Sequence, residues 1–481
     1  MPTLQEPDDQ TVNPGQSVSQ PIAWEDFRDH LATAEKDGRR KWVYPKKVTG
    51  KWYRYRTYMS WLLLGLMFIG PFITIGGNPL LMMNLIERRF SILGQIFWPQ
   101  DMVIFAVAML LFLMGIIIFT SAFGRLWCGW ACPQTVLMEM VFRKIEYLIE
   151  GDAASRRALD AAKWDRPKIL RKGFKHLLFL GLSFAIGNWL LSYIIGLESL
   201  LEIVVDDPRN HLVGLGFMLV FTAIFYLIFA RFREQACTFI CPYGRFQSAI
   251  LDENSMVVAY DHKRGEKRGP LKRKSAGSGD CVDCFQCVAV CPTGIDIRNG
   301  TQMECVNCTA CIDACDAVMA KLNLPPGLVR YASLNSIDRK ERFRFTARMA
   351  CYAAVLAALS VLFIFLLFTR TGTETAFLRA PGALFQELPG DKISNLYTVK
   401  TINKTNRDLP LEFKLLNLEG NLRVMGDTHF TVAKGSLAQT SVLVEIEKRF
   451  LLPGKTKLEI EVISANEKLE TVRTVFVGPR N

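Results

Sequence analysis

Long apolar segments constrain the fold of this 481-residue chain more than any other feature of its sequence. Half of the residues are hydrophobic, and they are concentrated in blocks. A bilayer core about 30 Å thick needs roughly 20 apolar residues in a helix, so each block is about long enough to cross a membrane. The sequence therefore predicts five spans, near Ser60–Gly76, Met102–Phe123, His176–Leu197, His211–Ala230 and Met349–Phe368.

Positive charge is distributed unevenly around these blocks, and the net charge is +12. Lys and Arg are frequent before the first block and in residues 125–175 and 231–348, but scarce in 87–100 and 198–210. Because cytoplasmic loops are enriched in Lys and Arg, this alternation predicts a cytoplasmic N-terminus and an external C-terminus. The basic residues do not alternate with aromatic residues as in an RNA- or DNA-binding module, so we expect no nucleic-acid partner.

The sequence before the first span predicts a cytoplasmic tail, residues 1–57, because it lacks the apolar core of a signal peptide. Every cysteine precedes Tyr352, and the predicted external region has none. Cytoplasmic thiols stay reduced and available for metal, so this distribution favours metal ligation over disulfides.

Eight cysteines between Asp280 and Asp316 form two runs with the same spacing, C-x-x-C-x-x-C-x-x-x-C. This spacing is typical of proteins that bind two [4Fe-4S] clusters, in which the fourth cysteine of each run ligates the other cluster. The predicted ligand sets are Cys281, Cys284, Cys287 with Cys315, and Cys305, Cys308, Cys311 with Cys291.

The alternative for these runs is a pair of structural zinc sites, since C-x-x-C pairs also bind Zn²⁺. Zinc sites need two such pairs separated by a longer loop, whereas three cysteines at successive spacings of three match the cluster pattern. The second run departs from the first at one position, because Asp316 stands where the first run has Pro292. This change could alter the turn after Cys315, but it removes no ligand.

Two further cysteine pairs share the motif C-x-x-x-C-P, and each follows a predicted span. Proline restricts the residue before it to extended geometry and is favoured as the first residue of a helix. Each motif therefore predicts a corner at which one helix ends and an interfacial helix, such as Val136–Ile149, begins. The four cysteines are Cys128 and Cys132 in the first corner, and Cys237 and Cys241 in the second.

The repetition predicts a duplicated two-span unit in which the four corner thiols converge. Soft thiolates select Cu(I), zinc or iron–sulfur centres, so we expect a metal or redox site there, with small buried cysteines at helix ends as the alternative. His176 and His211 border spans and could touch a quinone, while Cys351 is expected to serve packing.

The region after the last span changes to short alternating strands separated by Gly, Pro and Asn, for example at Ser441–Ile446 and Thr471–Val477. This rhythm predicts an all-β, immunoglobulin-like sandwich of about a hundred residues. We expect it to be a docking module, because its lone histidine, His429, forms no catalytic constellation.

The predicted architecture is an α-helical integral membrane protein with about five spans, a cytoplasmic ferredoxin-like insert with two [4Fe-4S] clusters, and a C-terminal immunoglobulin-like sandwich. The predicted parts are the tail 1–57, a four-helix membrane domain 58–252, the ferredoxin-like domain 253–348, the fifth helix 349–370 and a periplasmic sandwich 371–481.

This order of parts, with paired C-x-x-x-C-P corners and two ferredoxin runs, resembles the CcoG family over nearly the whole chain. The family is also called FixG or RdxA, the accessory proteins of cbb-type cytochrome c oxidase. The resemblance implies a multi-pass protein of the bacterial inner membrane that reduces Cu(II) to Cu(I) during oxidase assembly. It implies that the eight cysteines of the runs bind the clusters, and that Cys128, Cys132, Cys237 and Cys241 form the catalytic copper or redox site.

The partners implied are oxidase assembly factors or a copper chaperone and an unidentified cytoplasmic electron donor, and a homodimer is left open. Two other functions remain open from the sequence. One is a quinol dehydrogenase resembling NapH, which has the same corners and clusters but lacks the external β domain. The other is an assembly scaffold whose clusters are only structural.

Overall fold

A computed structural model of the chain describes residues 33, 34, 37, 39–84, 89–270, 277–382, 384–426, 430–465 and 467–479. The chain divides into two compact units. The first contains the described residues up to Arg56 together with Phe123–Arg171 and Arg233–Phe343, and the second contains Thr57–Ala122, Lys172–Phe232 and Arg344–Asn481.

The first unit consists mostly of short helices and contains all of the predicted ligand cysteines. Its helices and helical turns within the described residues are α3 (Leu126–Trp130), α4 (Pro133–Val136), η3 (Leu137–Phe142), α5 (Arg143–Ile149), α6 (Ala153–Ala161), η6 (Ala236–Ile240), α10 (Pro242–Ile250), α11 (His262–Gly265), α12 (Gln286–Ala289), η8 (Ile297–Asn299), α13 (Ala310–Lys321) and α14 (Leu334–Asp338).

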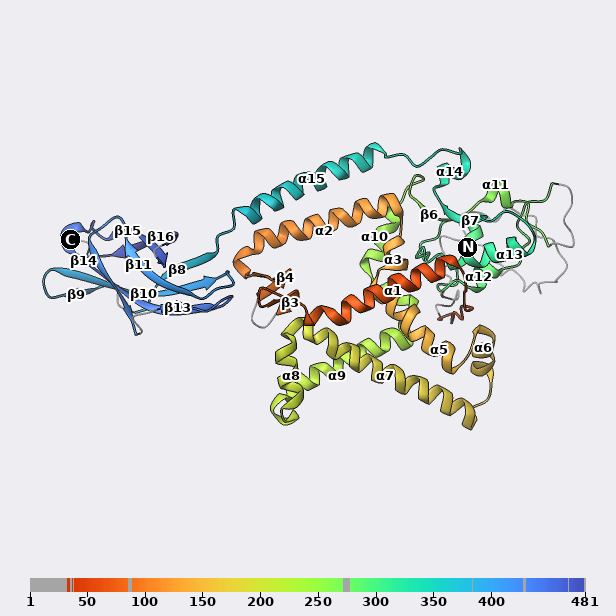
Figure 1. Cartoon of the computed structure of the whole chain (residues 1–481), viewed down its shortest axis with the longest axis horizontal. Helices are drawn as coiled ribbons and strands as arrows, with labels where there is room; N and C mark the ends of the chain where they lie inside the picture. Colours follow the sequence, from red (N-terminus) through yellow and green to blue (C-terminus); the bar gives the residue numbers. More distant parts are fainter. Residues whose placement is uncertain are drawn as a thin grey trace, which may run out of the picture. The chain divides into compact units, whose positions relative to one another are not determined.

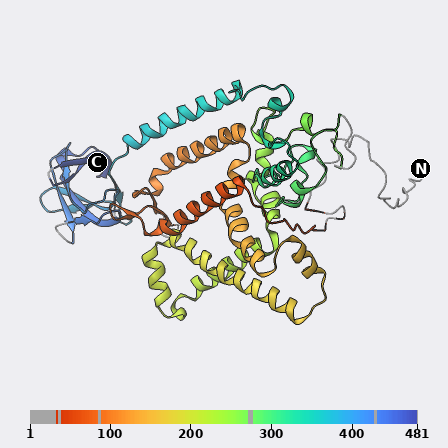
Figure 2. The ribbon, with the colours of Figure 1, turned by 45° about the vertical axis from the view of Figure 1, so that its right-hand side comes forward.

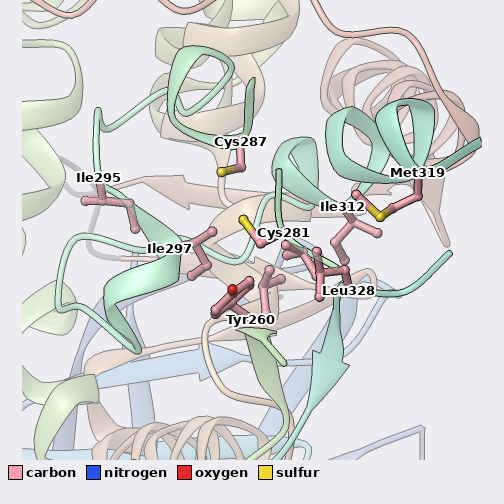
Figure 3. Close-up of a cluster of buried hydrophobic side chains, with 10 residues drawn as sticks. Tyr260, Cys281, Cys287, Ile295, Ile297, Ile312, Met319 and Leu328 are labelled. Atoms are coloured by element: carbon pink, nitrogen blue, oxygen red, sulfur yellow. The ribbon is translucent and has the colours of Figure 1, made fainter. Parts of the chain in front are cut away.

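A two-stranded antiparallel sheet closes the segment that carries the two cysteine runs. Strand β6 (Val257–Tyr260) pairs with β7 (Val329–Ala332), so residues before the first run lie beside residues after the second. Aliphatic side chains form the core beneath the runs, and Figure 3 shows Cys281 and Cys287 among Ile295, Ile297 and Leu328.

The second unit contains helices of membrane-spanning length. Within the described residues, four helical segments are long and apolar enough to cross a bilayer: α2 (Met102–Phe123), α7 (Arg166–Ile195), Pro208–Phe232 and α15 (Ala347–Phe368). The third of these comprises η4 (Pro208–His211), α9 (Leu212–Leu227) and η5 (Ile228–Phe232), and α8 (Leu197–Val205) precedes it. Four of the five predicted spans are thus confirmed as apolar helices of sufficient length.

The first predicted span differs from the prediction. Helix α1 (Lys51–Ile69) begins in the basic sequence and ends before Pro71, where a turn, η1 (Gly70–Phe72), follows. Proline lacks a backbone N–H and its ring disfavours continuation of the helix, so the apolar part of α1 is only Met59–Ile69. Eleven residues rise about 16 Å, roughly half of a bilayer core.

Short hairpins follow α1. They comprise β1 (Thr74–Ile75), β2 (Asn78–Pro79), β3 (Leu81–Asn84), β4 (Arg89–Ile92) and β5 (Gln95–Phe97). Strands β3, β4 and β5 form an antiparallel sheet, and the turn η2 (Pro99–Asp101) leads into α2.

The C-terminal region is an all-β sandwich, as predicted, and its strands are drawn in blue in Figures 1 and 2. One sheet has the order β12-β14-β10-β8 with β9 paired to β10, and the other has the order β13-β11-β15-β16. The strands are β8 (Thr373–Arg379), β9 (Gln386–Leu388), β10 (Lys392–Asn403), β11 (Leu409–Leu415), β12 (Gly420–Met425), β13 (Phe430–Val432), β14 (Leu437–Glu447), β15 (Lys455–Ser464) and β16 (Glu467–Val477).

Alternating side chains of the two sheets form one core. Val442, Val444 and Ile446 of β14 are fully buried against Leu458 and Ile460 of β15. The Tyr397 hydroxyl on β10 donates to the carbonyl oxygen of Val475 on β16, at 2.9 Å, and so joins the sheets. His429 lies outside the described residues.

Candidate metal centres

The two cysteine runs have the same unusual backbone geometry. In the first run Asp283 and Phe285, which flank Cys284, have positive φ angles of 53° and 54°. The equivalent residues of the second run, Asn307 and Thr309, have φ angles of 52° and 64°. Left-handed residues alternating with right-handed ones turn successive backbone N–H groups to one side, and such concavities bind phosphate groups and Fe–S centres.

The structure brings the cysteines of the runs together around two cavities. The first cavity is lined by Cys281, Cys284, Cys287 and Cys315. The second cavity is lined by Cys291, Cys305, Cys308 and Cys311, and Cys287 also reaches it. These are the two crossed sets that the spacing predicts.

A helix explains why the sets cross. Cys311 and Cys315 lie on α13, one helical turn apart, and α13 runs from the second cavity to the first. Asp316 continues this helix, and its carboxylate accepts a hydrogen bond from the Gly327 backbone at 2.8 Å. A proline at position 316, as at position 292 of the first run, would interrupt α13. Asp316 instead lets the helix continue, and Cys315 stays in the cysteine set that the spacing predicts.

The donor chemistry fits a [4Fe-4S] group. Burial raises the pKa of Cys287 and Cys305 to about 12, so these thiols keep their protons until a cation displaces them. Burial also raises the pKa of Cys291, although the Thr293 hydroxyl lies 3.3 Å from its sulfur and backbone N–H groups donate to it. Such N–H donors to cysteine sulfur are among the features that set cluster potentials.

The number of cysteines at each cavity suits an iron–sulfur cluster. Four cysteines line each cavity, and four thiolates are the ligands that one [4Fe-4S] cluster takes. Within the described part of the chain, no three His, Cys, Asp or Glu side chains lie as ligands of a single metal ion.

Both C-x-x-x-C-P motifs form corners, as predicted. Cys132 has an extended backbone, with φ −61° and ψ 125°, and Pro133 begins α4. Cys241 is likewise extended, with φ −74° and ψ 113°, and Pro242 begins α10.

The two corners lie against each other. The side-chain amide of Gln247, on α10 of the second corner, donates to the sulfur of Cys128 in the first, at 3.1 Å. Arg125, just before the first corner, donates to the backbone oxygen of Gly244, just after the second. Burial, and to a smaller extent negative charge on the neighbouring corner thiols, raise the pKa of Cys237 to about 12. The corner cysteines are thus near enough to interact electrostatically, although no three of these described side chains lie as ligands of one metal ion.

The first corner also packs against the second cysteine run. Gly129 faces the backbone oxygens of Val306 and Asn307 so closely that a Cβ atom would not fit. The Trp130 indole donates to the Asn307 oxygen at 3.3 Å, and Arg56 donates to the Gly129 oxygen at 2.7 Å. The motifs in the sequence did not predict a role for Gly129 or Gln247. The one sequence signal for this contact is the Gly-Trp pair between Cys128 and Cys132.

Other residues singled out in the sequence lie elsewhere. Cys351 is exposed on α15 in the second unit. His176 on α7 lies 2.9 Å from the Tyr226 hydroxyl on α9, through its Nδ1 atom, whereas His211 pairs with Asp206 at 2.9 Å.

The apolar helices, the crossed cysteine sets and the C-terminal all-β sandwich define a class of protein, the membrane-bound iron–sulfur proteins. Family models agree with this class. A 4Fe-4S dicluster domain matches residues 232–334, a 4Fe-4S binding domain matches 105–150, and an IG-like fold at the C-terminal of FixG matches 363–479.

Relatives identify the family. The chain is 34% identical to protein RdxA and 35% to protein RdxB of Cereibacter sphaeroides, over 76% of this chain and 80% of each relative. It is 38% identical to the nitrogen fixation protein FixG of Rhizobium meliloti over 62% of this chain and 58% of that protein. The chain belongs to the FixG/RdxA family.

A solved structure, a FixG-related protein from Vibrio parahaemolyticus, is similar to 22% of this chain and to 97% of its own length. Its sequence identity is 22% and its TM-score is 0.19, too low to support a structural comparison.

Proposed function

We propose that this chain is a membrane-bound cupric reductase, which takes electrons from a cytoplasmic donor and reduces Cu(II) to Cu(I) at the cysteine corners. The cofactors would be two [4Fe-4S] clusters, which supply one-electron redox chemistry when bound. The residues that would hold them are Cys281, Cys284, Cys287 and Cys315 for one, and Cys291, Cys305, Cys308 and Cys311 for the other.

The close contact of Gly129 with Val306 and Asn307 is the observation that carries this proposal. It brings the first corner onto the loop between Cys305 and Cys308, at the wall of the second cavity. An electron leaving that cavity therefore has a short, packed path to the corner thiols.

Copper chemistry suits the corners. Cys128, Cys132, Cys237 and Cys241 supply soft sulfur ligands, which bind Cu(I) in preference to harder cations. A site that stabilises Cu(I) favours reduction of bound Cu(II). The protein needs no general base for this step, because one electron is the whole change.

The family and the charge distribution support a location and a role. The first unit, which is basic before α1 and in 231–348, would lie on the cytoplasmic side of a bacterial inner membrane, and the sandwich on the periplasmic side. Cu(I) would pass to a copper chaperone or to assembly factors of a cbb-type oxidase, with the sandwich as the docking module. A homodimer is compatible with this role.

The test uses the full-length protein, purified anaerobically with its clusters. The protein is reduced with dithionite, freed of excess reductant and mixed with Cu(II), and Cu(I) is counted by the absorbance of a specific chelator. We expect Cu(I) up to the number of reduced clusters. A variant with all four corner cysteines changed to Ser should lose this activity, whereas Cys351→Ser, on α15, should keep it.

Two outcomes would defeat the proposal: no Cu(I) from the wild-type protein, or full activity in the four-serine variant. Clusters that cannot be reduced at all would instead favour the assembly scaffold.

A quinol dehydrogenase is a second candidate, favoured by the hydrogen bond between His176 and Tyr226. An imidazole and a phenol joined at an exposed surface of two apolar helices would accept a proton from a quinol. Reduction of the clusters by a soluble quinol, lost in His176→Ala, would support this candidate over a cytoplasmic donor.

A further inference from the structure

A third cavity lies in the first unit beside the second corner. Its wall contains three sulfur-bearing residues: Met138, Cys237 and Met303. Met138 is only 4% exposed and Met303 is 40% exposed, so the cavity has one deep and one open sulfur residue.

Two of the three sulfur residues come from widened helical turns. Met138 lies in η3 and Cys237 in η6, and both segments are π-helical. A π-helical turn is rare and occurs frequently at functional sites. Two such turns facing one cavity, from segments about a hundred residues apart, are a second observation that marks this place.

The charged side chains of the wall are engaged with other groups, so the sulfur atoms are the ligands that remain for a cation. Glu139 is paired with Arg143, and Glu234 with Arg40, each at 2.8 Å. The third carboxylate of the wall, that of Glu304, is buried and also has an interaction partner. Arg125 uses its guanidinium to bind the backbone oxygens of Met303 and Gly244. A wall that combines a thiol, two thioethers and paired carboxylates suits a soft cation of low charge.

The cavity shares its wall with the second cysteine cavity. Thr293 and Val306 line both of them. Thr293 contacts the sulfur of Cys291 at 3.3 Å, and Val306 follows Cys305 in the chain. A cation in the third cavity would therefore be separated from the second ligand set by single residues.

We propose that this cavity is the exit site of the reaction, where Cu(I) is held by Cys237, Met138 and Met303. The proposal rests on the proposed function and names the residues that receive its product. Cu(II) gains one electron from a reduced iron–sulfur centre, which is thereby oxidised by one electron. The Cys237 thiol releases its proton to solvent when its sulfur binds copper, and the two thioethers bind without losing a proton.

The thioethers explain how copper can leave. A site of thiolates alone binds Cu(I) so firmly that transfer is slow, whereas neutral thioethers weaken the site. Met303, the more exposed residue, gives the ion a path out of the first unit to a copper chaperone on the same side of the membrane.

The test uses Ag(I) as a probe, because it has the ligand preference of Cu(I), and the clusters are oxidised beforehand so that the protein holds no electron to reduce it. The full-length protein, loaded with its clusters, is titrated with Ag(I) against a competing chelator. In a protein whose Cys128, Cys132 and Cys241 are changed to Ser, which removes the competing corner thiols, we expect Met138→Leu combined with Met303→Leu to weaken Ag(I) binding at the remaining non-cluster site by tenfold or more. Leu has nearly the volume of Met, and so it leaves the packing unchanged.

Met140→Leu is the matched control, since Met140 is a buried methionine on the same turn that does not line the cavity. The single variant Met303→Leu is a second control, because Met303 is half-exposed and its replacement disturbs the fold little. The visible absorption of the clusters reports whether each variant is folded. Equal Ag(I) affinity in the double variant and in Met140→Leu would overturn the proposal. Failure of the wild type to reduce Cu(II), with Ag(I) binding still dependent on the methionines, would instead sink the reductase and leave a soft-cation site.

Discussion

Gly129, between the two cysteines of the first corner, lies against the backbone oxygen of Val306, between two cysteines of the second run. The contact leaves no room for a side chain at position 129. The φ angle of Gly129 is not positive, so glycine is required here by the close approach of the Val306 backbone and not by the backbone conformation of residue 129.

Replacement of Gly129 by Ala should separate the corner from the second run. The new Cβ would collide with backbone atoms of Val306 and Asn307, which cannot rotate away as a flexible side chain could. Since a displacement of about 1 Å can cost roughly a hundredfold in rate, we expect Cu(I) formation to slow by about tenfold to a hundredfold. Stopped-flow measurement of cluster reoxidation by Cu(II) checks this.

Gly181→Ala is the control for that variant, because a Cβ at Gly181 meets no atom within 4 Å. Equal reoxidation rates in Gly129→Ala, Gly181→Ala and the wild type would show that the contact has no part in electron transfer.

Because the ligand sets cross, replacement of the fourth cysteine of each run should disturb a different cluster. Cys315→Ser should disturb the cluster held with Cys281, Cys284 and Cys287, because these residues line one cavity. Cys291→Ser should disturb the other cluster. Low-temperature EPR of the reduced proteins should show one cluster lost in each variant, with different spectra remaining. Identical remaining spectra would contradict the crossing.

Thr293→Val should lower the reduction potential of the second cluster. The Thr293 hydroxyl lies 3.3 Å from the Cys291 sulfur and can donate to it once that sulfur is a thiolate. Loss of a hydrogen bond to a charged sulfur destabilises the more negative, reduced form, by an amount on the order of tens of millivolts. A redox titration followed by EPR measures the shift, and a potential unchanged or higher than that of the wild type would refute it.

Asp101→Asn should destabilise the second unit. Asp101 is buried and accepts from Arg370 at 2.9 Å and from Lys404 at 2.7 Å. Removal of the charge leaves the largely buried side chain of Arg370 without its carboxylate and leaves Lys404 with Glu374 alone, which costs up to about 3 kcal/mol. Thermal unfolding of the full-length protein in detergent should show a lower midpoint, with Asp391→Asn, at an exposed turn, as the control.

The pH dependence of the same carboxylate has a defined sign. Burial raises the pKa of Asp101, but hydrogen bonds from Lys404, Arg370 and the Trp98 backbone outweigh it, so the pKa lies below its ordinary value. A carboxyl with a lowered folded pKa stabilises the fold above its unfolded pKa of about 3.9, and the contribution is lost as the pH falls through the folded pKa. The stability difference between wild type and Asp101→Asn should therefore be constant from about pH 5 to pH 8 and shrink in stronger acid.

Local sequence patterns predicted much of the architecture. Four apolar helices and the strands around Tyr397 and Val444 follow from hydrophobic period and length. The extended backbone at Cys132 and Cys241 follows from the proline after each, because the pyrrolidine ring restricts its neighbour regardless of context. The end of α1 at Ile69 shows the limit of such patterns. The apolar sequence continues past Pro71, so hydropathy alone predicted a span that extends beyond the end of the helix.

The sequence by itself determined which cysteines belong to each set and where each corner turns, because spacing and proline act over a few residues. Only the tertiary structure decided that Gln247 reaches Cys128, that Gly129 lies against Val306, and that Met138, Cys237 and Met303 share a cavity. These partners are separated by more than sixty residues along the chain, and no local rule specifies such distances. Packing of the whole first unit sets them, because each contact depends on the shape of every segment between.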